Sequence, residues 1–283
     1  MTITGFDGKG TPFEQSDRFL TTRILARREA LGRPILVGLC GAQGSGKSHT
    51  AARLVERLAA EGCSAAALSI DDFYLSQAAR RDLAREVHPL LATRGVPGTH
   101  DLALGRATIA ALLAARHGAV TPLPRFDKTI DDRAPEETWP QHAGPAQVVV
   151  LEGWCVGARP EPAQALAAPV NALEANEDSD GRWRTHVNGQ LAGSYRDFFA
   201  MLDLTILLRA SSFEQVLGWR TEQERGLVRT PGVSHPAMDD AALRRFIAHY
   251  ERITRALLAT EPAEIVVPLG PDRAPLEARE GER

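Results

Sequence analysis

PILVGLCGAQGSGKSHTAARLVERLAAEG, residues 34–62, is the stretch of sequence that decides the fold. The apolar run PILVGLC predicts a buried strand, and the apolar spacing in SHTAARLVERLAAEG predicts a helix that ends at Gly62. Between them lies GAQGSGKS, residues 41–48, which matches the pattern G-x-x-x-x-G-K-[ST]. A loop of this pattern between a strand and a helix is typical of proteins that bind nucleotide phosphates.

Four further apolar runs predict strands, at 65–70, 147–153, 203–210 and 263–269, and helical patterns lie between them. This alternation predicts an α/β fold, a doubly wound parallel sheet with helices on both faces. Ligands bind outside the carboxyl ends of the strands in such sheets. Asp71 and Asp72 follow the second strand and Glu152 closes the third, so we expect these acids to converge on the glycine loop.

The whole chain, residues 1–283, is predicted to be a single domain with two elaborations. Apolar residues recur at helical spacing within 16–31, and Gly-Arg-Pro ends the pattern, so residues 1–33 are expected to form an N-terminal helical extension. Residues 156–200 carry clusters of Pro, Asn, Asp and Gly, and we expect them to form an irregular insertion or cap.

The composition is that of an ordinary globular protein, with 43% apolar and 24% charged residues. The formal net charge is -3 and the basic residues are dispersed, which argues against general nucleic-acid binding. No apolar signal core or stretch of roughly 18 apolar residues is present, so we expect a cytoplasmic protein without membrane binding. Cys40, Cys63 and Cys155 lack the spacing of a disulfide framework or a zinc site, and Cys40 and Cys155, which adjoin apolar runs, are expected to be buried thiols. The sequence gives no indication of the oligomeric state.

The residue types of the glycine loop suit the binding of phosphate groups. Glycines let the backbone turn tightly and direct its N–H groups inward, and the N-terminus of the following helix adds favourable partial charge for phosphate oxygens. Lys47 is expected to bridge the β- and γ-phosphates of ATP, and Ser48 and Glu152 are expected to hold Mg²⁺. The residues predicted to bind ATP are Gly41, Ala42, Gln43, Gly44, Ser45, Gly46, Lys47, Ser48 and His49.

Asp71 and Asp72 lie where a carboxylate can accept the proton of a substrate hydroxyl as the γ-phosphoryl group leaves ATP. The alternative for either acid is a helix N-cap, and for Glu152 a carboxylate that caps a neighbouring loop. Phe73 and Tyr74 belong either to the wall of the acceptor site or to the core. The Asn-Lys-x-Asp signature of GTPases and a glutamine-bearing switch loop after Glu152 are both absent, which favours a kinase over a switch protein.

Five segments occur in an order that resembles the D-glycerate 3-kinases: GAQGSGKS, SIDDFYL, RGVPGTHD, LPRFDKTIDDRAPEETWP and VVVLEGWCVG. The resemblance covers roughly residues 35–270, and these enzymes are themselves similar to the uridine kinase, phosphoribulokinase and pantothenate kinase group of P-loop kinases. It implies ATP-dependent phosphorylation of D-glycerate at its 3-hydroxyl, giving 3-phosphoglycerate and ADP with Mg²⁺. It also implies that Asp71, the first acid of its segment, is the base and that Asp72 is secondary.

These five segments carry the candidates that hold the acceptor, and a further segment carries the candidate that contacts the transferring phosphate. Glycerate is a small anion, so its pocket needs a fixed cation. WRTEQERG, residues 219–226, resembles the lid of these kinases, in which Arg220 is expected to close over the phosphate and to join Lys47 and Asp71 as a catalytic residue. Arg125 and Lys128 could instead belong to a solvated charged loop, and His100 and Asp101 could instead fix a turn. The lid-like residues 219–226 could instead form an ordinary surface helix. The residues predicted to bind the acceptor are Asp72, Tyr74, Arg94, His100, Arg125, Lys128 and Arg133.

Other activities stay open at this point. The acceptor could be a nucleoside, pantothenate or another sugar acid, because the same loop and acids serve those reactions. A regulatory or assembly module that binds ATP without an acceptor base is a second alternative. Plain ATP hydrolysis is a third, and it requires a water-positioning residue. The acids and the family-like loops favour a small-molecule acceptor, with D-glycerate first. The segment that lies near the adenine of ATP is expected just after residues 265–269.

Overall fold

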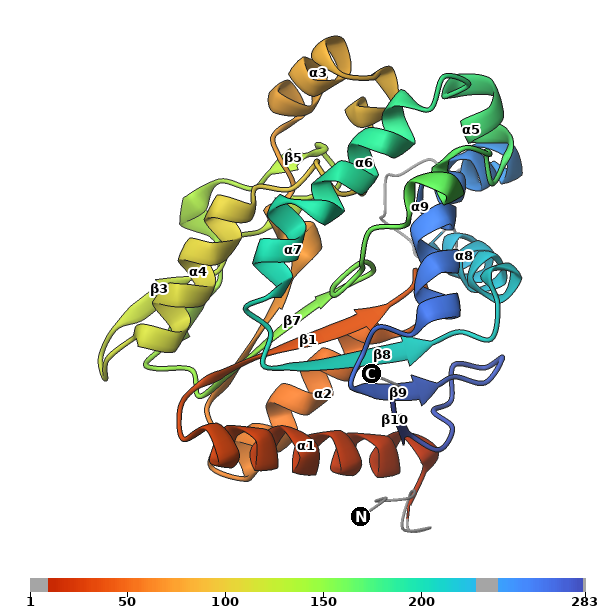
Figure 1. The fold of residues 1–283 in the computed structure, drawn as a ribbon. Coiled ribbons are helices and arrows are strands. Elements are labelled where there is room, and N and C mark those ends of the chain that lie inside the picture. The colour runs from red at the N-terminus through yellow and green to blue at the C-terminus, as the bar shows by residue number, and fades with distance from the viewer. Residues whose placement is uncertain (1–9, 228–238, 282–283) are drawn as a thin grey trace.

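Parallel strands form the centre of the molecule (Figure 1). The structure, a computed structural model, describes residues 10–227 and 239–281. The strands of its main sheet are β1 (Ile35–Gly41), β2 (Ala65–Ser69), β7 (Val148–Gly153), β8 (Leu204–Arg209), β9 (Ile265–Pro268) and β10 (Arg279–Glu280). Their order is β10-β9-β8-β1-β7-β2, and β10 is antiparallel to β9 while the others pair in parallel. All five strands predicted from apolar runs are confirmed.

Helices cover both faces of this sheet, as predicted (Figure 1). The helices are α1 (Pro12–Leu31), α2 (Lys47–Ala60), α3 (Gln77–Glu86), α4 (Leu102–Ala114), α5 (Ala172–Glu177), α6 (Arg182–Ala192), α7 (Ser194–Phe199), α8 (Phe213–Leu227) and α9 (Asp240–Thr260). Two small antiparallel pairs join β3 (Val120–Pro122) to β6 (Gln141–Ala143) and β4 (Phe126–Asp127) to β5 (Asp132–Arg133). The 3-10 turns are η1 (Ile70–Phe73), η2 (Pro89–Ala92), η3 (Glu136–Thr138) and η4 (Ala163–Leu166).

Helices α1 and α2 cover one face. Leu20 and Ile24 of α1 and Leu54 of α2 are fully buried in one cluster with side chains of β1, β7 and β8, and burying each such side chain contributes about 2 kcal/mol. Helix α1 begins before the predicted start because Thr11 and Glu14 form a capping box. The N-terminal helix is therefore part of the layer that covers the sheet, and residues 1–9 lie outside the described residues.

The other face is covered by α4, α6, α7 and α9, whose buried side chains share a cluster with those of β2 and β7. The prediction that residues 156–200 are irregular is wrong, since α5, α6 and α7 lie within them. The residues that suggested loops are helix ends instead: Asn171 caps α5, and Gly181, with a left-handed φ of 76°, precedes α6. Leu191 and Phe198 are buried in the core, so this segment belongs to the layer over the sheet.

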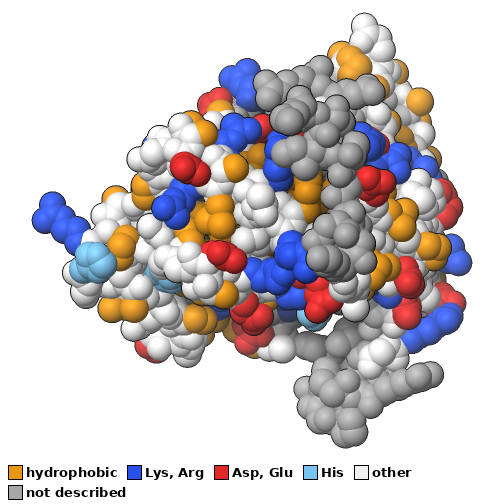
Figure 2. Space-filling view, turned by 90° about the horizontal axis from the view of Figure 1, so that it is seen from below, with side chains coloured by type: hydrophobic (Ala, Val, Ile, Leu, Met, Phe, Trp, Pro, Cys, Tyr) orange, Lys and Arg blue, Asp and Glu red, His pale blue; other side chains and the backbone are white. Residues whose placement is uncertain are grey.

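Within the described residues, no helix is both long and apolar enough to cross a membrane. The three cysteines are buried free thiols, as was predicted for Cys40 and Cys155. On the face shown in Figure 2, basic and acidic side chains of the described residues are interspersed with hydrophobic ones. This mixture is in keeping with the small net charge of -3.

Candidate active site

The glycine loop forms the turn from β1 into α2. Gly44 and Gly46 have φ angles of 77° and 84°, in the left-handed region where a side chain is disfavoured. Gly46 is the N-cap of α2, and no described side chain caps that helix. The first N–H groups of α2 are therefore left for an anionic ligand, and the helix dipole favours negative charge at the same place.

Ser48 and Glu152 lie in contact at the base of this loop. Strand β7, which carries Glu152, pairs directly with β1, as the predicted metal site required. The Ser48 hydroxyl donates to Glu152 Oε1 over 2.8 Å, while the buried Oε2 has no hydrogen-bond partner among the described residues. A hydroxyl and a carboxylate with a spare oxygen are ligands that suit Mg²⁺, so these two residues fit that ion.

Asp71 lies in η1, just beyond the carboxyl end of β2. Its Oδ1 accepts a hydrogen bond of 2.7 Å from the Tyr74 hydroxyl, and its Oδ2 lies 2.8 Å from the ammonium group of Lys128. Burial opposes ionisation of Asp71, but the charges of Lys128 and Lys47 outweigh burial and hold the pKa of this carboxyl well below its usual range. Asp71 is therefore ionised and able to accept a proton.

The carboxylate of Asp72 has different hydrogen-bond partners from that of Asp71. Its Oδ2 accepts from Arg125 Nη1 over 3.0 Å, and its Oδ1 accepts from the backbone N–H of Phe126 over 3.1 Å. Burial raises the pKa of Asp72, although Arg125 opposes this. Asp72 thus anchors the start of the loop that carries Lys128, and its secondary role in catalysis stays a prediction.

Tyr74 is the wall behind Asp71, and its ring is supported by buried aromatic residues. The His100 ring stacks on it with centroids 4.7 Å apart, and the Phe126 ring meets it edge-on at 5.2 Å. The Tyr195 hydroxyl lies 2.6 Å from His100 Nδ1 and accepts from the Gly98 backbone N–H. Burial lowers the pKa of His100 to about 4, so this imidazole is neutral near pH 7.

Two cations, Arg94 and Lys128, reach the cleft beside Asp71. Arg94 pairs with Asp131 and lies over the Phe126 ring, 5.5 Å from its centroid. The fully buried Arg80 also pairs with Asp131, so Arg94 is not the only cation that neutralises this acid. The side chain of Lys128 is 57% exposed, which leaves its ammonium group free to reorient toward a ligand.

Arg220 comes from α8, the helix that contains the lid-like sequence. Its guanidinium pairs with Glu224 at 2.7 Å and lies 5.8 Å from the centroid of the Phe246 ring. Its side chain is 14% exposed. The predicted lid, residues 219–226, lies entirely within α8, and the segment 228–238 that follows it lies outside the described residues.

These groups line one cleft of about 890 Å³, at the carboxyl ends of β1, β2 and β7. This size is within the range of small-molecule sites. It brings the phosphate loop and the three acids together, as the topology predicted, and Arg94 and Lys128 lie there with them. The lining residues are Gln43, Gly44, Gly46, Lys47, Ser48, His49, Ser69, Asp71, Asp72, Tyr74, Arg94, Lys128, Glu152, Trp154, Arg220, Glu222, Gln223, Phe246, Tyr250 and Arg273.

Comparison with known proteins gives the family. An uncharacterized kinase of Schizosaccharomyces pombe is 32% identical over 228 residues, which cover 77% of this chain and 79% of that protein. The chloroplastic D-glycerate 3-kinase of Arabidopsis thaliana is 30% identical over 85% of this chain, which spans about half, 51%, of that longer protein. The chain belongs to the D-glycerate 3-kinase family of P-loop kinases. It is an ATP-dependent kinase.

The fold agrees with this assignment. A D-glycerate 3-kinase from Cryptococcus neoformans has a similar structure, with a TM-score of 0.78, 24% sequence identity and coverage of 96% of this chain and 100% of that one. At this identity the similarity concerns the fold. No model of a protein family matches the sequence.

The structure divides the residues that were predicted from the D-glycerate 3-kinase resemblance. Asp72, Tyr74, Arg94 and Lys128 line the cleft, whereas His100, Arg125 and Arg133 are not among its described lining residues. His100 is buried behind Tyr74, and Arg125 is held by Asp72. Arg133 lies 3.1 Å from Asp101, the residue that caps α4. These three support the acceptor loop and the turn at Gly98.

Several residues of the kinase cleft were not predicted from the sequence, and the polar ones are Ser69, Glu222, Gln223, Tyr250 and Arg273. Arg273 follows β9, in the segment expected to lie near adenine, so its position in the sequence was a usable signal. Gln223 lies one helical turn from Arg220 on α8. Tyr250 lies on α9, and its helical pattern gave no sign that its hydroxyl reaches the Arg94 carbonyl, 3.2 Å away.

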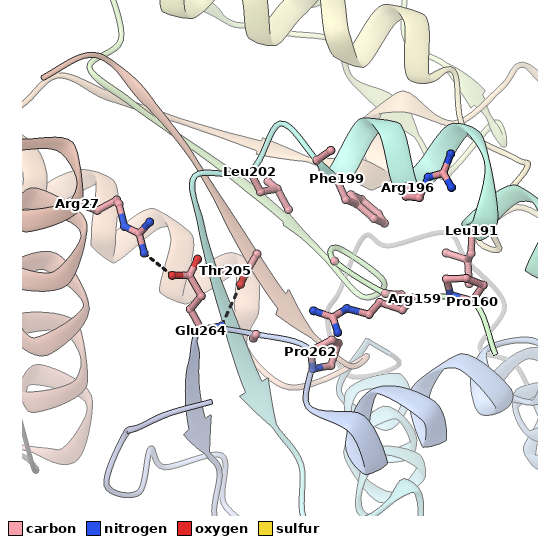
Figure 3. Close-up of a pocket in the computed structure, with 14 residues that line it drawn as sticks. Arg27, Arg159, Pro160, Leu191, Arg196, Phe199, Leu202, Thr205, Pro262 and Glu264 are labelled. Carbon is pink, nitrogen blue, oxygen red and sulfur yellow. Dashed lines mark hydrogen bonds and ion pairs between the residues drawn. The ribbon is translucent and has the colours of Figure 1, made fainter. Parts of the chain in front are cut away.

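A second pocket, of about 630 Å³, lies at the opposite edge of the sheet (Figure 3). It lies beside the amino-terminal ends of β8 and β9, and its walls include Phe199, Leu202 and Pro262. Arg27 is neutralised there by Glu264, and Arg159 extends toward Pro262. The pocket is separated from the phosphate loop by the length of the strands.

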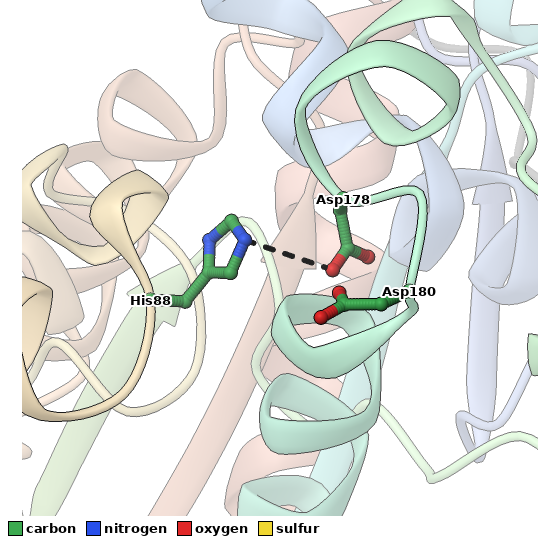
Figure 4. Close-up of side chains that lie close together, drawn as sticks. All are labelled: His88, Asp178 and Asp180. Atoms are coloured by element: carbon green, nitrogen blue, oxygen red, sulfur yellow. Dashed lines mark ion pairs between the residues drawn. The ribbon is translucent and has the colours of Figure 1, made fainter.

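His88, Asp178 and Asp180 form a cluster with the residue types of a metal site (Figure 4). However, His88 Nδ1 accepts the Leu90 N–H, so a neutral His88 carries its proton on Nε2, the atom that faces Asp178 at 3.9 Å. Asp178 already accepts from the backbone of Trp183 and from the guanidinium of Arg184. These bonds explain the cluster as a structural link between η2 and α6.

Proposed function

We propose that this kinase transfers the γ-phosphoryl group of ATP to the 3-hydroxyl of D-glycerate and releases 3-phosphoglycerate and ADP. The observation that carries the proposal is Asp71 with Lys128 and Arg94 beside it, in the cleft that holds the phosphate loop. A proton acceptor flanked by two cations suits an acceptor that is both an alcohol and an anion. The relatives named D-glycerate 3-kinases add support.

In this mechanism Asp71 takes the proton of the acceptor hydroxyl. As that proton moves to Asp71, the hydroxyl oxygen forms a bond to the γ-phosphorus, and the bond from the γ-phosphorus to the β,γ-bridging oxygen breaks with its electrons leaving on ADP. Tyr74 holds Asp71 Oδ1 in place through its hydroxyl. Lys47 and Arg220 lie in the same cleft, where their charges can stabilise the negative charge of the transferring group.

When the acceptor is bound, Lys128 can pair with either of two anions, the Asp71 carboxylate or the acceptor carboxylate. In the structure its ammonium group is bonded to Asp71 Oδ2. An acceptor carboxylate nearby would draw Lys128 away from that oxygen, and the pKa of Asp71 would rise, which makes Asp71 a stronger base. An uncharged acceptor would not do this, so the arrangement selects for a carboxylate.

Ser48 and Glu152 are the residues that would hold Mg²⁺, since they offer oxygen ligands beside the loop. When bound, the ion supplies positive charge to the phosphate oxygens. The single-domain organisation and the cytoplasmic location stay predictions from the sequence.

The proposal is tested by a coupled assay of ADP release with D-glycerate, L-glycerate, uridine and pantothenate as separate acceptors. D-glycerate is expected to give the highest kcat/KM, with phosphate recovered in 3-phosphoglycerate. Free phosphate released in the presence of D-glycerate would indicate hydrolysis, and a preference for uridine would exclude a carboxylate acceptor.

Matched variants test which cations hold the carboxylate. Arg94→Met is expected to raise KM for D-glycerate by about 10- to 100-fold, because a charge-assisted hydrogen bond contributes roughly 1.5–3 kcal/mol. Arg133→Met is the control, since Arg133 pairs with Asp101 and does not line the described cleft. Equal effects of the two substitutions on this KM would show that Arg94 acts through the fold and not by binding the acceptor.

A further inference from the structure

Arg273 lies where three separate segments meet: the phosphate loop, helix α8 and the turn after β9. Its Nε–H donates to the carbonyl oxygen of Gly44 over 2.8 Å. Its Nη2 lies 3.4 Å from the Trp219 carbonyl oxygen and 2.5 Å from Glu222 Oε2. One guanidinium group thus bonds to the phosphate loop and to two successive turns of α8.

The backbone around Arg273 holds this side chain in place. Arg273 has a φ of 69°, in the left-handed region that a residue with a side chain adopts at a cost of about 1 kcal/mol or more. A tight turn maintains it: the Gly270 N–H donates to Ala274 O over 2.9 Å, and the Ala274 N–H donates to Asp272 Oδ1 over 3.1 Å. The stem of Arg273 is therefore directed at the phosphate loop by its own turn.

Helix α8 and the phosphate loop are also packed directly against each other. A Cβ atom added to Gly44 would lie 2.8 Å from the Cβ of Trp219, closer than two such carbons can approach. The Trp219 indole N–H donates to Pro271 O over 2.7 Å, and the Arg273 guanidinium lies 5.7 Å from the Trp219 ring centroid. Trp219 itself is buried. The junction is therefore a defined contact and not a chance surface approach.

We propose that Arg273 is a positioning residue that holds the phosphate loop in its nucleotide-binding form by tying the Gly44 carbonyl to helix α8. The two ends of the Gly44–Ser45 peptide unit are then both fixed, because the Ser45 N–H donates to Ala42 O over 3.1 Å. The same bond sets the loop relative to Arg220, one residue after Trp219. The inference rests on the kinase assignment and is independent of which acceptor the enzyme uses.

A loop that is already held in its binding form loses less conformational entropy when the nucleotide binds. Loss of the Arg273 bond lets the loop populate other forms, and the apparent affinity falls by the fraction of molecules that remain competent. Loss of this bond is therefore expected to weaken nucleotide binding and to leave KM for the acceptor nearly unchanged.

The test measures ADP binding by isothermal titration calorimetry without acceptor, and steady-state kinetics with both substrates. Arg273→Ala is expected to raise Kd for ADP and KM for ATP about tenfold, equal to about 1.4 kcal/mol. KM for the acceptor at saturating ATP is expected to change less than twofold. Should Arg273→Ala not fold, Arg273→Met, which keeps the length of the stem and has no N–H to donate to Gly44, replaces it.

Two matched variants separate positioning from simple charge. Glu222→Gln removes the ion pair of Arg273 and leaves its bond to Gly44, so it is expected to lower ADP affinity less than Arg273→Ala does. Arg273→Lys keeps the positive charge and lacks the Nε–H, so it is expected to lose affinity as Arg273→Ala does. Wild-type affinity in Arg273→Ala would overturn the proposal. So would full rescue by Arg273→Lys, which would mean direct attraction between this charge and the phosphates.

Discussion

The replacement of Asp71 by Asn tests the proposed chemistry most directly. Asn has the same shape, and its amide oxygen can keep the hydrogen bond from the Tyr74 hydroxyl, 2.7 Å from Asp71 Oδ1 in the structure. The amide cannot take the acceptor proton. A positioned general base contributes roughly 10²- to 10⁴-fold in rate, so kcat is expected to fall by that factor, or about 3–5 kcal/mol in activation free energy.

The fold should tolerate this substitution. The side chains of Asp71 and Lys128 are 27% and 57% exposed, so the ion pair that is lost stabilises the protein by about 1 kcal/mol or less. For a chain of this size, that loss lowers Tm by about 2–4 °C at most. A large fall in kcat with a nearly unchanged Tm would therefore separate catalysis from stability.

The assay is coupled ADP release with ATP and D-glycerate varied in turn. KM for ATP is expected to stay within about threefold, because the phosphate loop and Glu152 are untouched. Asp72→Asn is the neighbouring control: it loosens the bonds to Arg125 and Phe126, and it is expected to affect Tm and KM for D-glycerate more than kcat. If Asp71→Asn retained more than a tenth of wild-type kcat, Asp71 would not be the base. If Asp72→Asn lost more kcat, the role would pass to Asp72.

Three further predictions follow from the surroundings of the site. Glu152→Gln is expected to raise the Mg²⁺ concentration for half-maximal activity at least tenfold, measured by metal titration at fixed ATP; an unchanged requirement would remove Glu152 from the metal site. Lys128→Met is expected to shift the acid limb of kcat/KM upward by about 1–3 pH units, because Asp71 loses the cation that lowers its pKa and is active only when deprotonated; a pH profile checks this. His100 has a folded-state pKa of about 4, below its unfolded value, so its contribution to stability is present above about pH 6.5 and is lost as pH falls toward 4. In denaturant titrations, His100→Phe should therefore lose about 3 kcal/mol less unfolding free energy than wild type between pH 7 and pH 4, and equal pH dependence of the two proteins would contradict the buried neutral imidazole.

Helix content is where the sequence interpretation failed. In residues 156–200, Asn171 and Gly181 resemble loop residues because each favours a non-helical backbone conformation. In the structure they stand at the start of the short helices α5 and α6, which bury Leu173 and Trp183 in the core. Helices of this length depend on tertiary packing for their stability, and that packing is not visible in local periodicity.

The sequence by itself determined the phosphate loop, the five parallel strands and the positions of Asp71 and Glu152. These features depend on local pattern and on one rule of parallel sheets, namely that strand ends meet at one edge. The bond between Ser48 and Glu152, which are 104 residues apart, follows directly from β1 lying beside β7.

Only the tertiary structure decided which cations face the cleft. Arg94, Arg125, Lys128 and Arg133 are equivalent in the sequence, since each is a basic residue in a polar loop. Their roles separate because Asp72 holds Arg125, Asp101 holds Arg133, and Lys128 and Arg94 are left at the cleft. The role of Arg273 could not be predicted for the same reason, because its bond to Gly44 joins residues 229 positions apart. A charged side chain takes its function from the partner it reaches, and that partner is set by how distant segments pack.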